Sequence, residues 1–457
     1  MPGQLTLRTF SPRMKTTYSN ADAFIAQLKN IEELIIQNQL QDAAEKLNVL
    51  GKTDSHDPRL FILGSRLAQA SGNAAGMLQA ARKAHELAPE WPIATIRLAK
   101  VLEEQQQVPE AIKMADAAIE QATQQSTLDV GLLSHASAIA QRQGYISLAL
   151  KWLDTAEKLQ PEDLIIRLQT ARAFDVADKH EQAIARFTSL MEHLPGNADL
   201  LSSRMHSYLK SNQMDMAIVD GEELVKLQPD DERHRFFLSY ARGENPQNQP
   251  AGVISTLFDG YAERFDKHLV VQLQYRLPQD VANMIHSWHS DRKGDVLDLG
   301  CGTGLLGACL GPIQGVLVGV DLSIEMIDKA IAHKVYDKFH HVDVVAALKA
   351  TPADQYHVIA ALEVFVYIGN LDEIVPNAFR ILVPGGRFIF SCELAEEGEN
   401  DFNLQQTFRY THQTKYLKRL MEETGFEELV LDERSVRMHA GEPVSGLLVI
   451  GRKPAAS

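Results

Sequence analysis

A period of 34 residues runs through the N-terminal half of the chain and limits what that half can fold into. Three alanines keep this spacing, and a proline follows each of them after twelve residues: Ala149, Ala183, Ala217, then Pro161, Pro195 and Pro229. A small side chain lets two helices cross closely. Proline ends a helix because it has no amide hydrogen to donate. Ala43 and Ala111 keep the same period further back, after a four-residue shift of the frame near residues 124–127. The pattern predicts stacked helix pairs.

These features resemble the tetratricopeptide repeat over about residues 22–242, with about six units, some of them degenerate. The resemblance implies an all-α solenoid with an extended concave face. Such a face commonly binds a peptide, a helix or another protein. The alternative is a repeat that serves only as a scaffold or dimerisation module.

A change in composition separates the two halves of the chain. Residues 243–252 are rich in Pro, Asn, Gln and Gly, which is typical of linkers. We therefore expect a second domain over residues 253–457.

The second half alternates apolar strand patterns with helical ones. Strands are expected near 294–304, 315–323, 339–345 and 355–368, and two more near 427–438 and 444–453. Residues 371–394 are expected to form a helix, a turn and then a fifth strand. This alternation predicts an α/β fold with a doubly wound, mainly parallel, Rossmann-like sheet. In such a sheet, ligands bind beyond the carboxyl ends of the strands.

Glycines and acids gather at the ends of the first two expected strands. Gly300, Gly302 and Gly304 follow strand one, and Asp321 ends strand two, where a carboxylate can accept both hydroxyls of a ribose. A dinucleotide or adenosylmethionine would suit this pattern alone. Leu305 stands where the dinucleotide fingerprint requires its third glycine. Asp298, inside strand one, is a buried acid that needs a partner or a role, such as supporting the loop and a positively charged methionine group.

Together with the turn Leu382–Gly386, these motifs resemble the class I S-adenosylmethionine-dependent methyltransferases. The resemblance implies that the glycine loop cradles the amino-acid part of the cofactor and that Asp321 holds its ribose. It also places an acid and an apolar residue of strand three at the adenine, and an acid of strand four between cofactor and acceptor. The matching adenine-side residues are Leu322, Met326, Asp343 and Val344, and the strand-four acid is Glu363.

A segment before strand one carries a possible lid. Residues 257–278 resemble the matching segment of predicted bacterial methyltransferases that carry tetratricopeptide repeats. The resemblance implies that Tyr261, Phe265 and His268 close the cofactor site. The alternative for Tyr261 and Phe265 is packing against the sheet.

Candidate acceptor residues lie between strand five and the last helix. Residues 403–416 contain Arg409, Tyr410, His412 and Tyr416, and the strand-four exit contains Phe365 and Tyr367. In this fold the insertion usually covers the acceptor. We expect His412 to act as a base and Tyr410 to form a pocket wall, with helix capping and packing as the alternative. A base is required only if the acceptor loses a proton.

Composition excludes several other classes of protein. The formal net charge of −15 argues against a nucleic-acid partner, which would require clustered basic residues. The three cysteines have no disulfide-framework or zinc-site spacing, and the histidines suggest no metal site. The chain shows no signal-peptide pattern and no apolar run long enough for a membrane helix. We expect a cytoplasmic protein.

Three functions remain open. The first is a methyltransferase whose repeats recruit a protein, peptide or carrier-bound acceptor, which raises the acceptor's effective concentration. The second is a small-molecule or natural-product methyltransferase whose repeats serve assembly. The third is a non-catalytic interaction protein that keeps the cofactor fold. We favour the first, with S-adenosylmethionine converted to S-adenosylhomocysteine.

Overall fold

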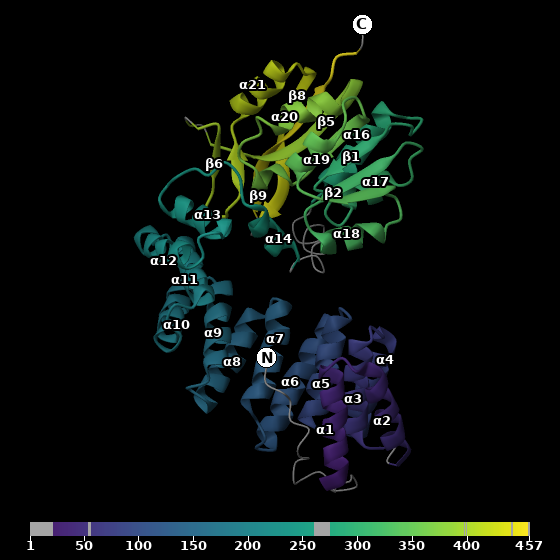
Figure 1. Cartoon of the computed structure of the whole chain (residues 1–457), viewed down its shortest axis with the longest axis vertical. Coiled ribbons are helices and arrows are strands. Elements are labelled where there is room, and N and C mark those ends of the chain that lie inside the picture. The colour runs from purple at the N-terminus through teal and green to yellow at the C-terminus, as the bar shows by residue number, and fades with distance from the viewer. Residues whose placement is uncertain are drawn as a thin grey trace. The chain divides into compact units, whose positions relative to one another are not determined.

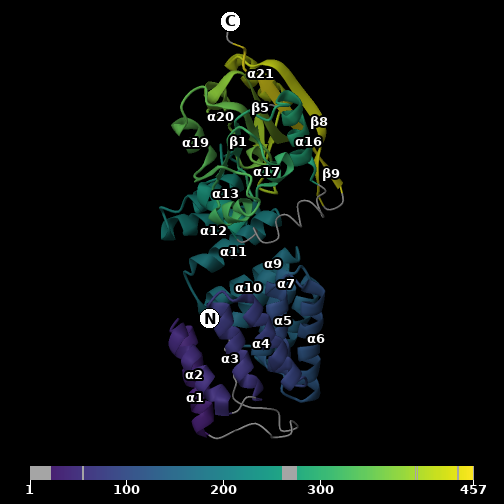
Figure 2. The ribbon, with the colours of Figure 1, turned by 90° about the vertical axis from the view of Figure 1, so that its right-hand side faces the viewer.

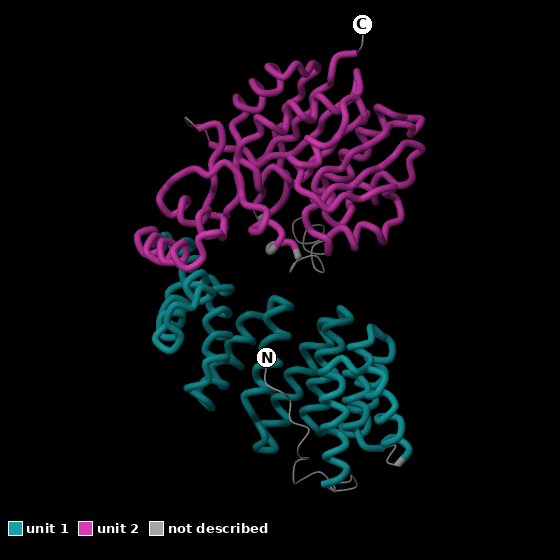
Figure 3. Tube along the Cα trace, in the orientation of Figure 1, with its two compact units in different colours: residues 1–212 teal, residues 213–457 magenta. Residues whose placement is uncertain are grey.

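The chain divides into two compact units, residues 1–212 and 213–457 (Figure 3). This computed structural model describes residues 22–53, 56–259, 275–396, 398, 400–439 and 442–455.

The first unit is a stack of antiparallel helix pairs, as Figures 1 and 2 show. Its helices are α1 (Asp22–Ile36), α2 (Leu40–Thr53), α3 (Pro58–Ala70), α4 (Ala74–Leu87), α5 (Pro92–Glu104), α6 (Val108–Gln124), α7 (Val130–Arg142), α8 (Ile146–Leu159), α9 (Leu164–Val176), α10 (His180–His193) and α11 (Ala198–Lys210). The predicted repeat fold is confirmed, with two helices in each unit of the 34-residue frame.

The periodic residues have the roles that the sequence predicted. Ala149 and Ala183 are fully buried on the second helix of their pairs. Pro161 follows the end of α8 at Leu159, so it lies just outside that helix. Several first helices begin at side-chain caps: Asp163, for example, accepts hydrogen bonds from the amides of Ile165 and Ile166 and thereby satisfies free donors of α9.

The second unit begins with two further repeat helices and continues into a mixed sheet. Its helices are α12 (Met214–Leu227), α13 (Glu232–Ala241), α14 (Ala251–Asp259), α16 (Leu277–Trp288), α17 (Leu305–Leu310), α18 (Ile324–Ile331), α19 (Val344–Ala350), the 3-10 turn η2 (Phe365–Tyr367), α20 (Ile374–Ile381) and α21 (Thr414–Thr424). The strands are β1 (Val296–Leu299), β2 (Leu317–Asp321), β3 (Lys338–His341), β4 (Tyr356–Ala361), β5 (Leu382–Leu394), β6 (Phe402–Leu404), β7 (Tyr410–His412), β8 (Glu427–His439) and β9 (Glu442–Arg452).

The sheet has the order β3-β2-β1-β4-β5, with all five strands parallel. Strand β9 pairs antiparallel with β5 over residues 387–393, and β8 pairs with β9. The strand order reverses at β1, which has β2 on one side and β4 on the other. The predicted doubly wound α/β fold is therefore confirmed, and its switch point lies at the carboxyl end of β1.

Helices cover both faces of this sheet. Residues of α16 and α17, such as Val281 and Leu306, pack on one face in a cluster with Val296. Residues of α19, α20 and α21, such as Leu348 and Leu417, pack on the other face. Because both faces are buried, the central strands are apolar throughout, and Asp298 is the one acid inside β1.

The predicted acceptor insertion forms a small hairpin. Strands β6 and β7 pair antiparallel, and β7 adds to the carboxyl end of β5 through Glu393 and Leu394. The hairpin therefore extends the sheet beside the switch point.

Across the described ranges, no helix combines the length and the apolar character needed to cross a membrane.

Candidate active site

One cavity of about 310 Å³ opens where the carboxyl ends of β1, β2 and β4 meet. Its volume falls in the range of about 300–1,000 Å³ that is common for small-molecule sites. Among its lining residues are Asp298, Gly300, Gly302, Asp321, Leu322, Met326, Asp343, Val344, Glu363 and Tyr367. The structure thus brings together predicted residues that lie far apart in the sequence.

The glycine loop turns sharply at the end of β1. Gly300 has a φ of +64°, and a Cβ placed on it would lie 2.4 Å from Cγ2 of Val364. Any side chain at this position would therefore collide with the β4 exit as well as strain the backbone. Gly304 caps α17 and is not among the residues that line the cavity. Its predicted direct contact with a cofactor is not supported.

Asp321 is held at the end of β2 by the loop opposite. Its Oδ2 accepts a hydrogen bond from the Gly302 amide at 2.8 Å, and its Oδ1 accepts one from the Ser323 amide at 2.9 Å. Burial raises the pKa of Asp321, while these amide bonds act in the opposite direction. A fixed carboxylate in the cavity wall suits two neighbouring hydroxyls, as the sequence predicted.

Asp298 lies inside β1 and is almost fully buried. Its Oδ2 accepts a hydrogen bond from the Tyr336 hydroxyl at 2.6 Å. Burial raises the pKa of Asp298 to about 7, although the Tyr336 bond favours the charged form. The predicted support role therefore includes a partner, Tyr336, that the sequence did not identify.

The remaining cofactor-side residues line the part of the cavity near β2 and β3. Met326 is buried on α18, and Leu322 precedes that helix. Asp343 caps α19, because its Oδ1 accepts a hydrogen bond from the Ala346 amide at 2.9 Å. Val344 follows it in the cavity wall. This group combines an apolar surface with one exposed carboxylate.

Glu363 lies just after β4 on the opposite side of the cavity. Its φ of 59° is unusual for a residue with a Cβ, and such strain is often found at functional positions. The Ser391 hydroxyl accepts its amide hydrogen at 2.9 Å. Its Oε2 is bound by Arg409 at 2.6 Å. No described residue forms a hydrogen bond with its other oxygen, Oε1.

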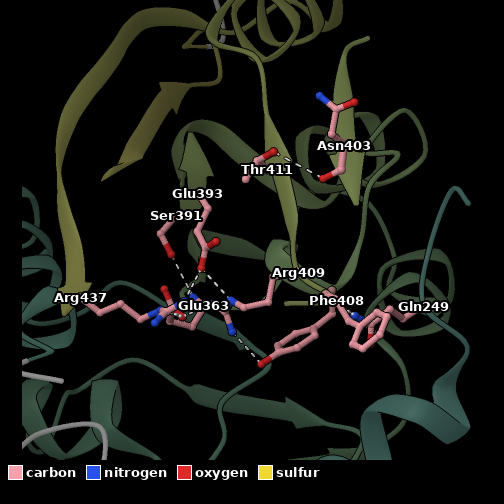
Figure 4. Close-up of polar contacts among 10 residues, drawn as sticks. Gln249, Glu363, Ser391, Glu393, Asn403, Phe408, Arg409, Thr411 and Arg437 are labelled. Carbon is pink, nitrogen blue, oxygen red and sulfur yellow. Dashed lines mark hydrogen bonds and ion pairs between the residues drawn. The ribbon is translucent and has the colours of Figure 1, made fainter. Parts of the chain in front are cut away.

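Arg409 joins this glutamate to a buried network of charges (Figure 4). It also binds Glu393 at 2.6 Å and donates to the Tyr367 hydroxyl at 2.9 Å. Arg437 binds Glu393 at 2.7 Å. Although burial alone would lower it, the pKa of Arg409 stays above its usual range because of Glu363 and the other acceptors. Two arginines and two glutamates therefore balance one another behind the cavity wall.

Four predicted acceptor residues are buried outside the cavity, which corrects the sequence-based expectation. Phe365 packs in the core between Phe388 and Phe390. The hydroxyl of Tyr410 donates to the Pro246 carbonyl at 2.9 Å, and Tyr416 binds the Leu371 amide. All three side chains thus hold elements together and do not line the cavity.

His412 is the fourth of these residues and is fully buried. Its Nε2 donates to the carbonyls of Ile368 and Gly369, at 3.1 and 3.0 Å. Burial lowers the pKa of His412 to about 4. A neutral ring with one nitrogen bound to carbonyls and no contact with the cavity does not fit a base, so the predicted role is not supported.

The predicted lid residues Tyr261, Phe265 and His268 lie outside the described residues. The described part of that region contributes Ile254 and Phe258 of α14 to the cavity. The ring of Phe258 packs edge-on against Tyr367, with 5.4 Å between the ring centroids.

Sequence reasoning missed several lining residues, among them Asn248, Gln249, Ile254, Phe258, Tyr275 and Ile368. Asn248 and Gln249 belong to the segment predicted as a linker. This segment has the composition of a linker, but Gln249 is only 8% exposed.

Comparison with known sequences relates the second half of the chain to methyltransferases. Residues 268–431 match the family model of a methyltransferase domain. The ubiquinone biosynthesis O-methyltransferase of Psychrobacter arcticus is 31% identical over 102 residues, which cover 21% of this chain and 39% of that protein. The corresponding enzyme of Coxiella burnetii is 29% identical over 100 residues, 21% of this chain and 42% of the relative. The chain thus spans about two fifths of the length of these curated relatives.

Solved structures resemble each half of the chain separately. The tetratricopeptide-repeat protein YrrB, described as having an unusual peptide-binding site, covers 43% of this chain and 97% of its own, with 19% identity and a TM-score of 0.36. A Burkholderia thailandensis 1,6-didemethyltoxoflavin-N1-methyltransferase bound to S-adenosylhomocysteine covers 46% of this chain and 93% of its own, with 18% identity and a TM-score of 0.35.

Proposed function

Because the chain carries a methyltransferase domain behind a tetratricopeptide-type repeat, we propose that it methylates an acceptor that its repeats recruit as a protein, peptide or carrier-bound group. The observation that carries this proposal is the single cavity lined by the glycine loop, Asp321 and Glu363. These residues combine a nucleoside-binding side with an acid that faces the acceptor side.

The residues fit S-adenosylmethionine as the methyl donor. The missing Cβ of Gly300 leaves room for a close approach to the backbone, and Asp321 offers a carboxylate to the ribose hydroxyls. Leu322, Met326 and Val344 provide apolar contacts for the adenine, and Asp343 an acceptor for its amino group. Asp298 supports the loop next to the methionine end.

When bound, this cofactor supplies a methyl group already activated by the sulfonium. The protein then has to orient the acceptor, exclude water and accept a proton if the acceptor carries one. Glu363 is placed to orient the acceptor and to accept its proton, because Arg409 fixes its Oε2 and leaves Oε1 without a hydrogen bond from a described residue. Tyr367 and Phe258 form an aromatic wall beside it.

The packing of α13 supports a link between the repeats and the acceptor side. The rings of Phe237 and Tyr240 on this last repeat helix pack edge-on against Phe408, at 5.2 and 5.3 Å. Phe408 immediately precedes Arg409, which holds Glu363. The last repeat helix, α13, is thus in contact with the loop that positions Glu363, on the side of the cavity proposed for the methyl acceptor.

A small-molecule methyltransferase is the second candidate. The curated relatives are O-methyltransferases of ubiquinone biosynthesis, and the cavity is largely apolar. In that case the repeats would serve assembly. Methylation by the full chain of a free small acceptor, with no protein or carrier attached, would favour this candidate.

Calorimetric titration of the full chain with S-adenosylmethionine tests the cofactor assignment. We expect micromolar affinity in the natural protein and a loss of at least about tenfold in Asp321→Ala, which is the cost of a charge-assisted hydrogen bond. Asp354→Ala is the control, because Asp354 pairs with Lys453 away from the cavity. No binding to the natural protein would leave the third function, a non-catalytic interaction protein.

A further inference from the structure

The segment between the repeats and the sheet domain, residues 243–252, is hydrogen-bonded to the side of the cavity proposed for the methyl acceptor. Asn245 pairs with β6 in both directions: its Nδ2 donates to the Phe402 carbonyl at 2.7 Å, and its Oδ1 accepts from the Leu404 amide at 3.1 Å. The Gln247 carbonyl accepts from the amides of Gly369 and Asn370. This segment therefore has a defined path along the cavity.

Gln249 is fixed within this segment from two sides. Its backbone amide donates to the Tyr367 carbonyl at 3.2 Å, and its Nε2 donates to the Phe408 carbonyl. A carbonyl can only accept, so the side-chain amide has one orientation, with the nitrogen towards Phe408 and Oε1 away from it. Figure 4 shows Gln249 beside Phe408.

Oε1 of Gln249 accepts no hydrogen bond within the described part of the chain, and Gln249 lines the cavity. Gln249 is only 8% exposed as a whole, and an acceptor on a mostly buried side chain is costly unless a ligand or water supplies a donor. Glu363, on the same cavity, also keeps one oxygen without a donor among the described residues. The side of the cavity proposed for the methyl acceptor thus has two oxygens that can accept hydrogen bonds from a ligand.

The carbonyl that orients Gln249 is itself held firmly. Phe408 has a φ of 57° and donates its amide hydrogen to the Gln405 carbonyl at 2.8 Å. Its ring is held by Phe237 and Tyr240 of α13. The position of the Gln249 side chain therefore depends on contacts that reach back to the last repeat helix.

We propose that Gln249 binds the methyl acceptor, and that its Oε1 accepts a hydrogen bond from an O–H or N–H group on a flat apolar ring. The aromatic wall of Phe258 and Tyr367 fits the ring, and the unpaired oxygens of Gln249 and Glu363 fit its proton-bearing substituents. This inference rests on the proposed methyl transfer and specifies the chemical class of acceptor group.

Phenol and anisole are the probes, because they share a flat ring and only phenol has a hydrogen to donate. Their affinities for the full chain saturated with S-adenosylhomocysteine are measured by ligand-observed NMR titration. We expect phenol to bind the natural protein about fivefold more tightly than anisole, which is the effect of one neutral hydrogen bond. In Gln249→Met the two affinities should agree within about twofold.

Gln247→Met is the matched control, because the Gln247 side chain binds exposed Asn370 and does not line the cavity. It should keep the preference for phenol. Equal binding of the two probes to the natural protein, or a preference that survives in Gln249→Met, would overturn the inference. A natural protein that does not bind S-adenosylhomocysteine would instead refute the proposed function.

Discussion

The Tyr336 hydroxyl is the hydrogen-bond donor to Asp298, although 38 residues separate them in the sequence. The two residues come together because Tyr336 packs against Gly307 of α17, the helix that follows β1, and the Gly307 amide donates a hydrogen bond to the same hydroxyl at 3.2 Å. This bond stabilises a carboxylate that burial would otherwise keep protonated.

The Tyr336–Asp298 bond predicts a pH-dependent stability loss in Tyr336→Phe. Asp298 keeps its proton in the folded protein up to a pKa of about 7, whereas the usual pKa of an aspartic acid in an unfolded chain is 3.8. Its contribution to stability is therefore full below about pH 4 and falls as pH rises towards 7. Without the tyrosine donor the pKa rises further. We expect Tyr336→Phe to lose about 1.5–3 kcal/mol more stability at pH 8 than at pH 5.

Urea denaturation at the two pH values measures this difference. Tyr356→Phe is the control, because Tyr356 is half-buried and makes no hydrogen bond to an acid of the cavity. Equal losses at pH 5 and pH 8 would mean that Tyr336 contributes only packing.

Alanine substitutions at Gly300 and Gly311 distinguish the cost of backbone strain from the cost of a steric clash. Both have a positive φ, +64° and +61°, but a Cβ on Gly311 would meet nothing within 4 Å. We expect Gly311→Ala to cost about 1–3 kcal/mol of stability with unchanged cofactor affinity, because its φ of 61° and ψ of −168° lie in a region that is almost exclusive to glycine. Gly300→Ala should cost more than this and abolish binding of S-adenosylhomocysteine, measured by calorimetry. Similar behaviour of the two variants would contradict the close approach at Gly300.

Removal of Arg409 should be severe, because it leaves two glutamates buried without their main partner. We expect Arg409→Met to destabilise the protein by about 3–5 kcal/mol, measured by chemical denaturation. Arg409→Lys should recover only part of the loss, since one ammonium cannot reproduce the separate bonds to Glu363, Glu393 and Tyr367. Arg419→Met, which removes an exposed pair with Asp401, should have little effect.

His412 should act through stability and not through proton transfer. The pKa of its buried ring is about 4, whereas the usual pKa of a histidine in an unfolded chain is 6.5. This group therefore stabilises the fold above pH 6.5 and loses that effect as pH falls towards 4. We expect His412→Gln to be less stable than the natural protein at pH 7, by about 1–2 kcal/mol. The gap should narrow at pH 5, and affinity for S-adenosylhomocysteine should be unchanged. A large loss of affinity in the folded variant would restore His412 to the site.

The cofactor side was predictable because its residues follow strand ends. Parallel strands meet at one sheet edge, so the loop at Gly300 and the acid Asp321 had to approach each other once the strands were identified. The strand-order reversal at β1 then placed Glu363 opposite them. Each inference needed only the local pattern and the rules of the parallel sheet.

The acceptor side was less predictable because it depends on pairing between distant segments. Tyr410 and His412 carry chemically suitable side chains, but β7 pairs with the end of β5, and this pairing turns both rings into the core. Residues 243–252 have the composition of a linker. Their amides satisfy backbone groups of β6 and η2, and a single sequence contains no sign of such partners.

The packing of α13 also determines where in the chain the repeat array could be exchanged for another. The unit that contains the cavity begins at Gln213, so α12 and α13 belong with the methyltransferase domain, although their sequence continues the repeat. An exchange of the repeat array at the composition change near residue 243 would remove the rings that hold Phe408. A junction just before α12 would keep them. An exchange of the preceding repeats should therefore place its junction before α12, where the unit that contains the cavity begins.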